Sequence, residues 1–259
     1  MNELLEGLLA DLNAESQALR AAVADLDEEQ WRTPTPAEGW DIATTISHLA
    51  WTDEASVAAG TDKAAWDALV AKALDDPDGF VDAEAVAGAR ASGSELLARW
   101  DASRPAVAGM LRRAEGKIAW FGPPMSPASM ATARFMETWA HALDVYDALG
   151  VTAERTDRVK HVCHLAVRTR GFAYSVRSLD APEAEVRVEL TAPSGAVWTW
   201  GDPATEQLIK GSAWDFARLA TQRVHRDDTD LVASGPDADQ WLDIIQAFAG
   251  PAGKGRDRA

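Results

Sequence analysis

The chain has 259 residues, 47% of them hydrophobic, so it can bury one large core or two moderate ones. Its 41 acidic and 25 basic residues give a formal net charge of −16, which disfavours binding to phosphate backbones. The single cysteine, Cys163, excludes an intrachain disulfide and a multi-cysteine zinc site. The N-terminal segment lacks the basic start and apolar run of a signal peptide, and no apolar stretch reaches about 18 residues. We therefore expect a cytoplasmic protein that binds neither nucleic acid nor membrane.

The first half of the chain predicts a helical bundle. Leucines and valines in residues 2–25 recur at spacings of three, four and seven, which is typical of an amphipathic helix. Similar patterns predict helices at residues 41–59, 63–74, 82–114 and 128–149. Pro105 lies inside the segment 82–114 and should kink or interrupt that helix. Gly150 is the expected C-cap of the helix at 128–149. Four long amphipathic segments indicate a four-helix bundle in residues 1–152.

After Gly150 the pattern changes to a mixture of helices and strands. Residues 154–177 predict a helix, residues 184–191 alternate in the manner of a strand, and residues 197–200 form the return strand of a hairpin. Shorter elements are expected at residues 207–210 (strand), 212–222 (helix), 231–233 (strand) and 237–248 (helix). We therefore expect a smaller α+β domain at 153–250, followed by a polar, disordered tail at 251–259.

Three residues from two distant segments form a candidate metal site. Glu137 and His141 are four residues apart, so on a helix both side chains point from one face and can reach one ion. His48 lies about two turns into the helix that Asp41 is expected to cap. If the two helices pack side by side, the three residues form a set of two histidines and one carboxylate. Zinc in catalytic sites often has three protein ligands and an open fourth position.

Each of these residues also has an ordinary structural interpretation. A single histidine such as His48 is commonly a core or surface residue, and Glu137 with His141 is also the spacing of a hydrogen-bonded helix pair. The conjunction of the three in a chain with only five histidines favours the metal site. The ion itself stays open, because iron accepts the same ligand set and nickel is a further alternative to zinc.

Other polar residues near these segments have less defined roles. Arg134 shares the helix face of Glu137 and could bind an anionic ligand, and Asp144 could orient a ligating imidazole; both could equally pair locally or face solvent. Arg223 could clamp a substrate carboxylate or be a surface residue. His161 and His164 could share a helix face, with Cys163 between them, but no carboxylate lies at matching spacing, so a core or surface role is the default.

Two stretches of the first half resemble a known family. They are Gly39–Leu49, GWDIATTISHL, and Glu137–Gly150, ETWAHALDVYDALG. They are similar to the mycothiol-dependent maleylpyruvate isomerase family, whose N-terminal domain is a DinB-like four-helix bundle. In the second half, VWTWG at 197–201 and GSAWDFARLATQR at 211–223 look like that family's C-terminal domain, which is similar to a sterol-carrier fold. The resemblance implies that His48, Glu137 and His141 bind zinc and that a C-terminal arginine, placed at Arg223, lies near the site.

The leading functional hypothesis is a divalent-metal enzyme, with zinc first, that uses a low-molecular-weight thiol such as mycothiol. Its substrate would be a small carboxylate, which an isomerase or a transferase would act on, with Arg134 or Arg223 holding the carboxylate. Two alternatives stay open: a metal-dependent hydrolase that uses bound water, and a non-catalytic metal or ligand carrier. The protein is expected to be a monomer or a homodimer.

Overall fold

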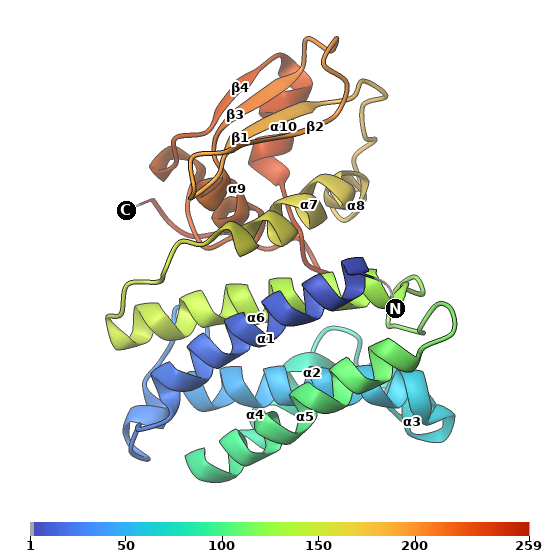
Figure 1. The fold of residues 1–259 in the computed structure, drawn as a ribbon, viewed down its shortest axis with the longest axis vertical. Coiled ribbons are helices and arrows are strands. Elements are labelled where there is room, and N and C mark those ends of the chain that lie inside the picture. The colour runs from blue at the N-terminus through green and yellow to red at the C-terminus, as the bar shows by residue number, and fades with distance from the viewer. Residues whose placement is uncertain (1–2, 259) are drawn as a thin grey trace. The chain divides into compact units, whose positions relative to one another are not determined.

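The computed structural model describes residues 3–258 and divides into two compact units, Met1–Ala153 and Glu154–Ala259. The first unit is helical (Figure 1). The second unit combines a small sheet with short helices. The predicted fold class, a helical bundle followed by a smaller α+β part, is therefore confirmed.

The helical unit is built on four long helices, α1, α2, α5 and α6. Helix α1 packs against α6, and α2 packs against α5 and α6, while two shorter helices join α2 to α5 (Figure 1). The bounds of the elements are α1 Glu3–Val23, η1 Gln30–Arg32 (a 3-10 turn), α2 Ile42–Thr61, α3 Lys63–Asp75, α4 Phe80–Gly88, α5 Gly93–Arg113 and α6 Pro127–Leu149. Gly150 ends α6 with φ of +66°, the left-handed conformation expected of a C-cap glycine.

The single helix predicted for residues 82–114 is wrong, because the chain breaks between α4 and α5. Ser92 forms a capping box with Glu95: the Glu95 N–H donates to Ser92 Oγ, and the Ser92 N–H donates to Glu95 Oε2 at 2.9 Å. A Cβ on Gly93 would lie 2.0 Å from Trp31 Nε1, so this close approach requires glycine. Pro105 lies within α5 and does not interrupt it. The serine three residues before a glutamate is a start signal that outweighs the apolar periodicity.

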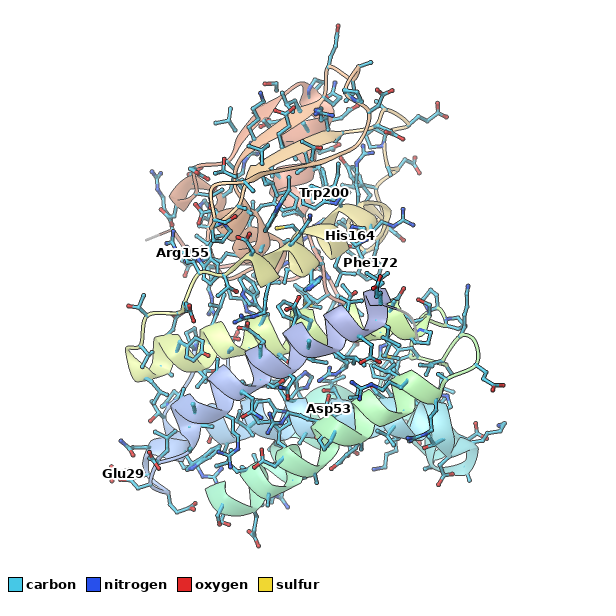
Figure 2. The ribbon with its side chains drawn as sticks, viewed as in Figure 1. Glu29, Asp53, Arg155, His164, Phe172 and Trp200 are labelled. Carbon is cyan, nitrogen blue, oxygen red and sulfur yellow. The ribbon has the colours of Figure 1, made fainter. Side chains whose placement is uncertain are left out.

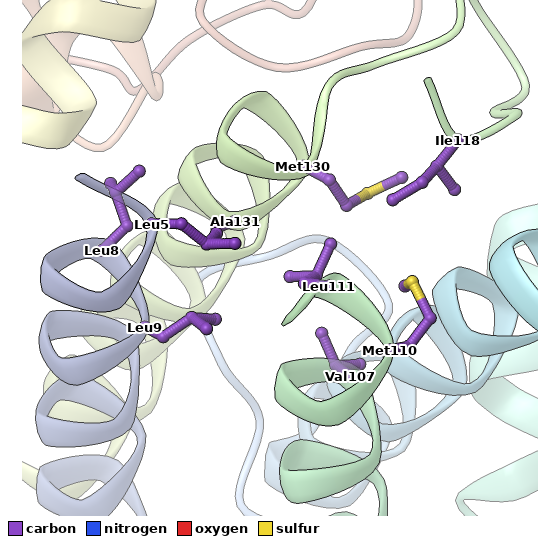
Figure 3. Close-up of a cluster of buried hydrophobic side chains, with 9 residues drawn as sticks. All are labelled: Leu5, Leu8, Leu9, Val107, Met110, Leu111, Ile118, Met130 and Ala131. Atoms are coloured by element: carbon purple, nitrogen blue, oxygen red, sulfur yellow. The ribbon is translucent and has the colours of Figure 1, made fainter. Parts of the chain in front are cut away.

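A cluster of buried apolar side chains joins the start of α1, the end of α5 and the start of α6 (Figure 3). Its members are Leu5, Leu8, Leu9, Val107, Met110, Leu111, Ile118, Met130 and Ala131. Ile118 belongs to the connection before α6, where its backbone pairs with that of Met125. Burial of each large aliphatic side chain contributes about 1.5–3 kcal/mol, so this cluster fixes α6 against α1 and α5.

The α+β unit contains a four-stranded mixed sheet with the strand order β2-β1-β3-β4. Strands β1 and β2 are antiparallel, which confirms the predicted hairpin, whereas β1 and β3 are parallel. The elements are η2 Asp157–Val159, α7 Lys160–Arg168, α8 Arg170–Ser175, β1 Arg187–Thr191, β2 Val197–Trp200, β3 Leu208–Ser212, α9 Ala213–Ala220, η3 Arg226–Asp228, β4 Val232–Ser234 and α10 Pro236–Ile244.

The helix predicted for residues 154–177 is only partly right. It begins as a 3-10 turn and is divided at Thr169 into α7 and α8. The Thr169 hydroxyl donates to Leu165 O at 2.9 Å and lies 3.1 Å from Gln246 O, so the break is tied to the end of the chain. Residues 251–258 contain no helix or strand, and their disorder stays a prediction. Among residues 3–258, every helix is too short or too polar to span a bilayer.

Candidate metal centre

The site lies where α2 and α6 face each other. Asp41 caps α2 as expected: its Oδ1 accepts the Thr44 N–H at 2.7 Å, so the helix starts at Ile42. This start places the buried side chain of His48 against α6. Two N-terminal signals begin α6, the Ser126 cap and Pro127 in the first turn, and its spacing places Glu137 and His141 on the face toward His48.

The three predicted ligands converge in the structure. Glu137 Oε2 lies 3.3 Å from His48 Nε2 and 3.4 Å from His141 Nε2. One ligand atom from each of the three residues lies within 4.8 Å of the others. Ligand atoms about 2.0–2.1 Å from a tetrahedral ion are about 3.4 Å apart, so the distances from Glu137 to the two histidines fit an ion the size of zinc. No other group of three or more potential ligands is found among the described residues.

The electrostatics of the site favour the protonation states that metal binding needs. Burial lowers the pKa of His48 to about 4, outweighing the hydrogen bond with Glu137, which raises it. Burial raises the pKa of Glu137, but hydrogen bonds with His141 and His48 prevail and hold that pKa well below its ordinary value. A neutral imidazole and an ionised carboxylate are the forms that coordinate a divalent ion.

A second carboxylate lies behind His141. The fully buried Asp144 places Oδ2 3.5 Å from His141 Nδ1, while Nε2 of the same ring faces Glu137. A metal-binding histidine usually has such an acceptor on its other nitrogen, because the acceptor fixes the tautomer and the plane of the ring. Of the two roles that the sequence left open for Asp144, its position beside His141 favours the orienting one.

Arg134 lies in the interior and not at an open surface. Only 2% of its side chain is exposed, and its Nε lies 3.0 Å from Asp53 Oδ1 (Asp53 is labelled in Figure 2). Its Nη2 also donates to Leu49 O at 3.3 Å, one residue after His48. These bonds join α6 to α2 beside the metal ligands. The surroundings of Arg134 thus favour a role in holding the two helices together, and its binding of a substrate carboxylate stays a prediction without support from this geometry.

Trp40 is a part of the site that the sequence reasoning missed. Its ring stacks on His141, with centroids 5.5 Å apart and planes 12° apart, and lies 5.1 Å from the ring of His48. Trp51 approaches His48 from another direction at 6.4 Å. The signal was present, because Trp40 directly precedes the Asp41 cap, but nothing in a linear pattern shows that its ring folds back over the histidines.

A cleft of about 640 Å³ borders the same tryptophan. Its lining includes side chains of both charges and an aromatic ring, among them Arg32, Glu38, Trp40, Asp41 and Arg90. This volume is in the range of small-molecule sites. The cleft shares Trp40 with the candidate metal site, because the same side chain lines the cleft and contacts the two histidines.

The second histidine group has a different environment. In the α+β unit, Trp200 Nε1 donates to His164 Nδ1 at 3.3 Å, and both residues are labelled in Figure 2. Cys163 is fully buried, its Sγ lies 3.3 Å from Ala213 O, and burial raises the pKa of its thiol above the ordinary value. His161, Cys163 and His164 do not form a metal-binding group in the part of the chain that the structure describes.

Arg223 follows α9 in the α+β unit. Its Nη1 donates to Thr221 O at 2.5 Å, and its backbone N–H donates to Arg218 O at 2.7 Å. These bonds fix the backbone where the chain leaves α9, and Gln222, two residues after the end of this helix, has a positive φ of 60°. A contact between Arg223 and a substrate stays a prediction.

Known proteins resemble this chain at two levels. Uncharacterized proteins from two strains of Mycobacterium tuberculosis are 50% identical over 250 residues, which cover 96% of this chain and 97% of each relative. A crystal structure of the mycothiol-dependent maleylpyruvate isomerase has a TM-score of 0.59 at 17% identity, covering 90% of this chain and 95% of that one. A histidine-to-alanine mutant of that isomerase gives 0.58 at 16%. At such identities these two structures show a shared fold.

The family itself is established by sequence. The model of the mycothiol maleylpyruvate isomerase N-terminal domain matches residues 12–146, more than half of the chain. The matched range contains His48, Glu137 and His141, and most of the helical unit. The chain therefore belongs to the mycothiol maleylpyruvate isomerase family.

Proposed function

We propose that the protein is a divalent-metal enzyme, with zinc as the first choice, that uses a low-molecular-weight thiol such as mycothiol on a small carboxylate substrate. The observation that carries this proposal is the convergence of His48, Glu137 and His141 within 4.8 Å of one another. Membership of the family supports the thiol, because the solved isomerase of this fold is described as mycothiol-dependent.

The residues of the chain divide the work in this proposal. Three side chains hold the ion, and Asp144 fixes the plane and tautomer of His141. When bound by three protein ligands, zinc keeps an open position and lowers the pKa of a thiol that enters it, so that the thiolate exists at neutral pH. The buried His48 and the mostly covered His141, with 12% of its side chain exposed, exclude water from two sides, and the quarter-exposed Glu137 marks the side from which reactants enter.

The chemistry follows from where the thiolate attacks. If its sulfur adds to a polarised carbon–carbon double bond, a C–S bond forms and the former double bond becomes free to rotate. Breaking the C–S bond then restores the double bond and releases the thiol unchanged, which is an isomerisation. If the sulfur instead displaces a leaving group, the thiol stays on the product and the reaction is a transfer. Arg223 is proposed to hold the substrate carboxylate.

The test is metal analysis of the purified protein, followed by cobalt substitution and addition of thiol. We expect about one divalent ion per chain and, with thiol added, an absorption band from sulfur to cobalt. The ligand variant His48→Ala should lose this ion. His225→Ala is its matched control, since this histidine caps a 3-10 turn in the other unit. Stoichiometric metal without a sulfur band would indicate the hydrolase alternative, and absence of stoichiometric metal would remove the enzyme proposal.

A further inference from the structure

Hydrogen bonds of the backbone fix the position of Trp40 independently of its side-chain contacts. The loop before α2 is closed by a bridge between Pro34 and Asp41. Trp40 O accepts the Thr35 N–H at 2.9 Å, and the Trp40 N–H donates to Ala37 O at 3.0 Å. Gly39 has φ of +77°, which a side chain would strain, and so allows the tight return of the chain. The indole ring therefore projects from a fixed point.

The ring itself is fixed at both ends. Its face and edge contact the two imidazoles at centroid distances of 5.5 and 5.1 Å, and its Nε1 donates to Asp82 Oδ1 at 3.2 Å. Asp82 lies in the first turn of α4, so this bond connects the ring to a different helix from those that carry His48 and His141. Trp40 is thus a link between α4 and the ligands on α2 and α6.

The two histidines differ in what orients them. His141 has the Asp144 carboxylate 3.5 Å from its Nδ1, an ion-pair contact, whereas the buried Nδ1 of His48 has neither a carboxylate within ion-pair distance nor a hydrogen-bond partner among the described residues. If Nε2 of a neutral His48 binds an ion, the ring proton lies on Nδ1. A ligand without an acceptor at its second nitrogen needs another constraint on its plane. The rings packed on His48 are those of Trp40, Trp51 and His141.

We propose that Trp40 is a positioning residue of the metal centre: it sets the plane of His48 by packing, in place of a hydrogen bond, and Asp82 anchors it. The inference rests on the proposed function, since it takes the three ligands to bind an ion. It predicts that metal affinity depends on an aromatic ring at position 40, although that ring supplies no ligand atom.

The first experiment measures cobalt affinity and the visible absorption spectrum in Trp40→Ala and Trp40→Phe. We expect Trp40→Ala to weaken cobalt binding about tenfold, as loss of outer-shell support does at other sites, and to alter the absorption bands. Phenylalanine keeps a ring against the imidazoles and should restore most of the affinity. Trp120→Ala is the control, because Trp120 is also half-buried and its ring pairs with Trp66 and Phe121. It should leave affinity and spectrum unchanged.

Because Trp40→Ala could disturb the fold, a variant at the surface tests the same inference without that risk. Asp82 is exposed, so Asp82→Ala removes the anchor without opening the interior, and we expect about a two- to threefold loss of cobalt affinity. A second readout needs no metal: the ring protons of His48 and His141 should shift in the NMR spectrum of Trp40→Ala but not of Trp120→Ala, because the indole ring current is removed.

The outcomes separate this inference from the proposed function. If wild-type protein binds no cobalt, both fail. If wild-type protein binds cobalt and Trp40→Ala binds it with the same affinity and spectrum, the positioning role is overturned while the metal site stands. Unshifted histidine ring protons in metal-free Trp40→Ala would overturn the packing on which the inference depends.

Discussion

The two groups of histidines in this protein look similar in the sequence and differ in the structure. His161 and His164 are three residues apart with Cys163 between them, and they lie closer together along the chain than His48 does to His141. Yet the ligand atoms of the distant set lie within 4.8 Å of one another, whereas the near set forms no such group in the part of the chain that the structure describes, and His164 accepts a hydrogen bond from Trp200. Convergence of helices matters more for a metal site than proximity in sequence.

The physical cause of the difference lies in what surrounds each group. Beside the bundle ligands, Arg134 of α6 binds Asp53 and the carbonyl of Leu49, both on α2, so the helices are held at the distance that the ligands need. Around α7, Cys163 is packed as a small buried residue and contacts a backbone carbonyl. The first group has the Glu137 carboxylate at its centre and the Arg134–Asp53 pair beside it.

The strongest way to break the comparison is to remove a ligand from the first group. His48→Ala or Glu137→Ala should abolish stoichiometric metal binding, with a loss of affinity of more than about 100-fold, because loss of outer-shell partners alone costs about 10–100-fold. Equilibrium dialysis with zinc, analysed by atomic emission, measures this. Retention of one tightly held ion in both variants would show that these residues are not the ligands.

The support beside the ligands can be removed next. Asp53→Ala leaves the buried Arg134 without its carboxylate and should lower the free energy of unfolding by about 3–5 kcal/mol. The double variant Asp53→Leu/Arg134→Met, which leaves no unpaired charge, should recover much of that loss. Urea denaturation followed by circular dichroism gives both values. A single variant as stable as wild type would mean that the pair does not hold α2 against α6. The exposed pair Glu6–Arg112 is the control, and Glu6→Ala should change the midpoint little.

The environment of Cys163 sharpens the contrast from the other side. Burial raises the pKa of its thiol, so it stays protonated and shielded at pH 8, and a thiol-specific reagent should label native protein far more slowly than protein in denaturant. Absorbance of the released chromophore follows the reaction. Rapid labelling of the native protein would instead point to a reactive thiol and reopen a role for Cys163 in chemistry.

The smallest expected effect is on the second histidine group itself. Replacing His161 and His164 together by alanine should leave the zinc stoichiometry unchanged and alter the affinity less than twofold, because neither residue belongs to the converging set. The same dialysis serves as the measurement. A clear loss of zinc in this variant, with His48 and Glu137 intact, would contradict the division between the two groups.

The sequence by itself determined the elements that carry the site. The Asp41 cap, the Ser126 and Pro127 start and the four-residue spacing of Glu137 and His141 are local features, and local hydrogen bonds and periodicity are enough to interpret them. The hairpin and the change from long helices to mixed helices and strands after Gly150 are also encoded by local sequence patterns. The break between α4 and α5 was also encoded locally, by Ser92 and Glu95, but the apolar pattern across it obscured that signal.

The tertiary structure decided which side chains meet. Arg134 has the spacing of a residue that faces the site, but only the packing of α6 on α2 shows that its guanidinium forms an ion pair with Asp53. The packing of Trp40 over both imidazoles likewise depends on a loop that folds back between helices, and no periodic pattern records this. Such contacts join residues many positions apart, and their energies exist only once the helices are assembled, so linear spacing cannot determine them.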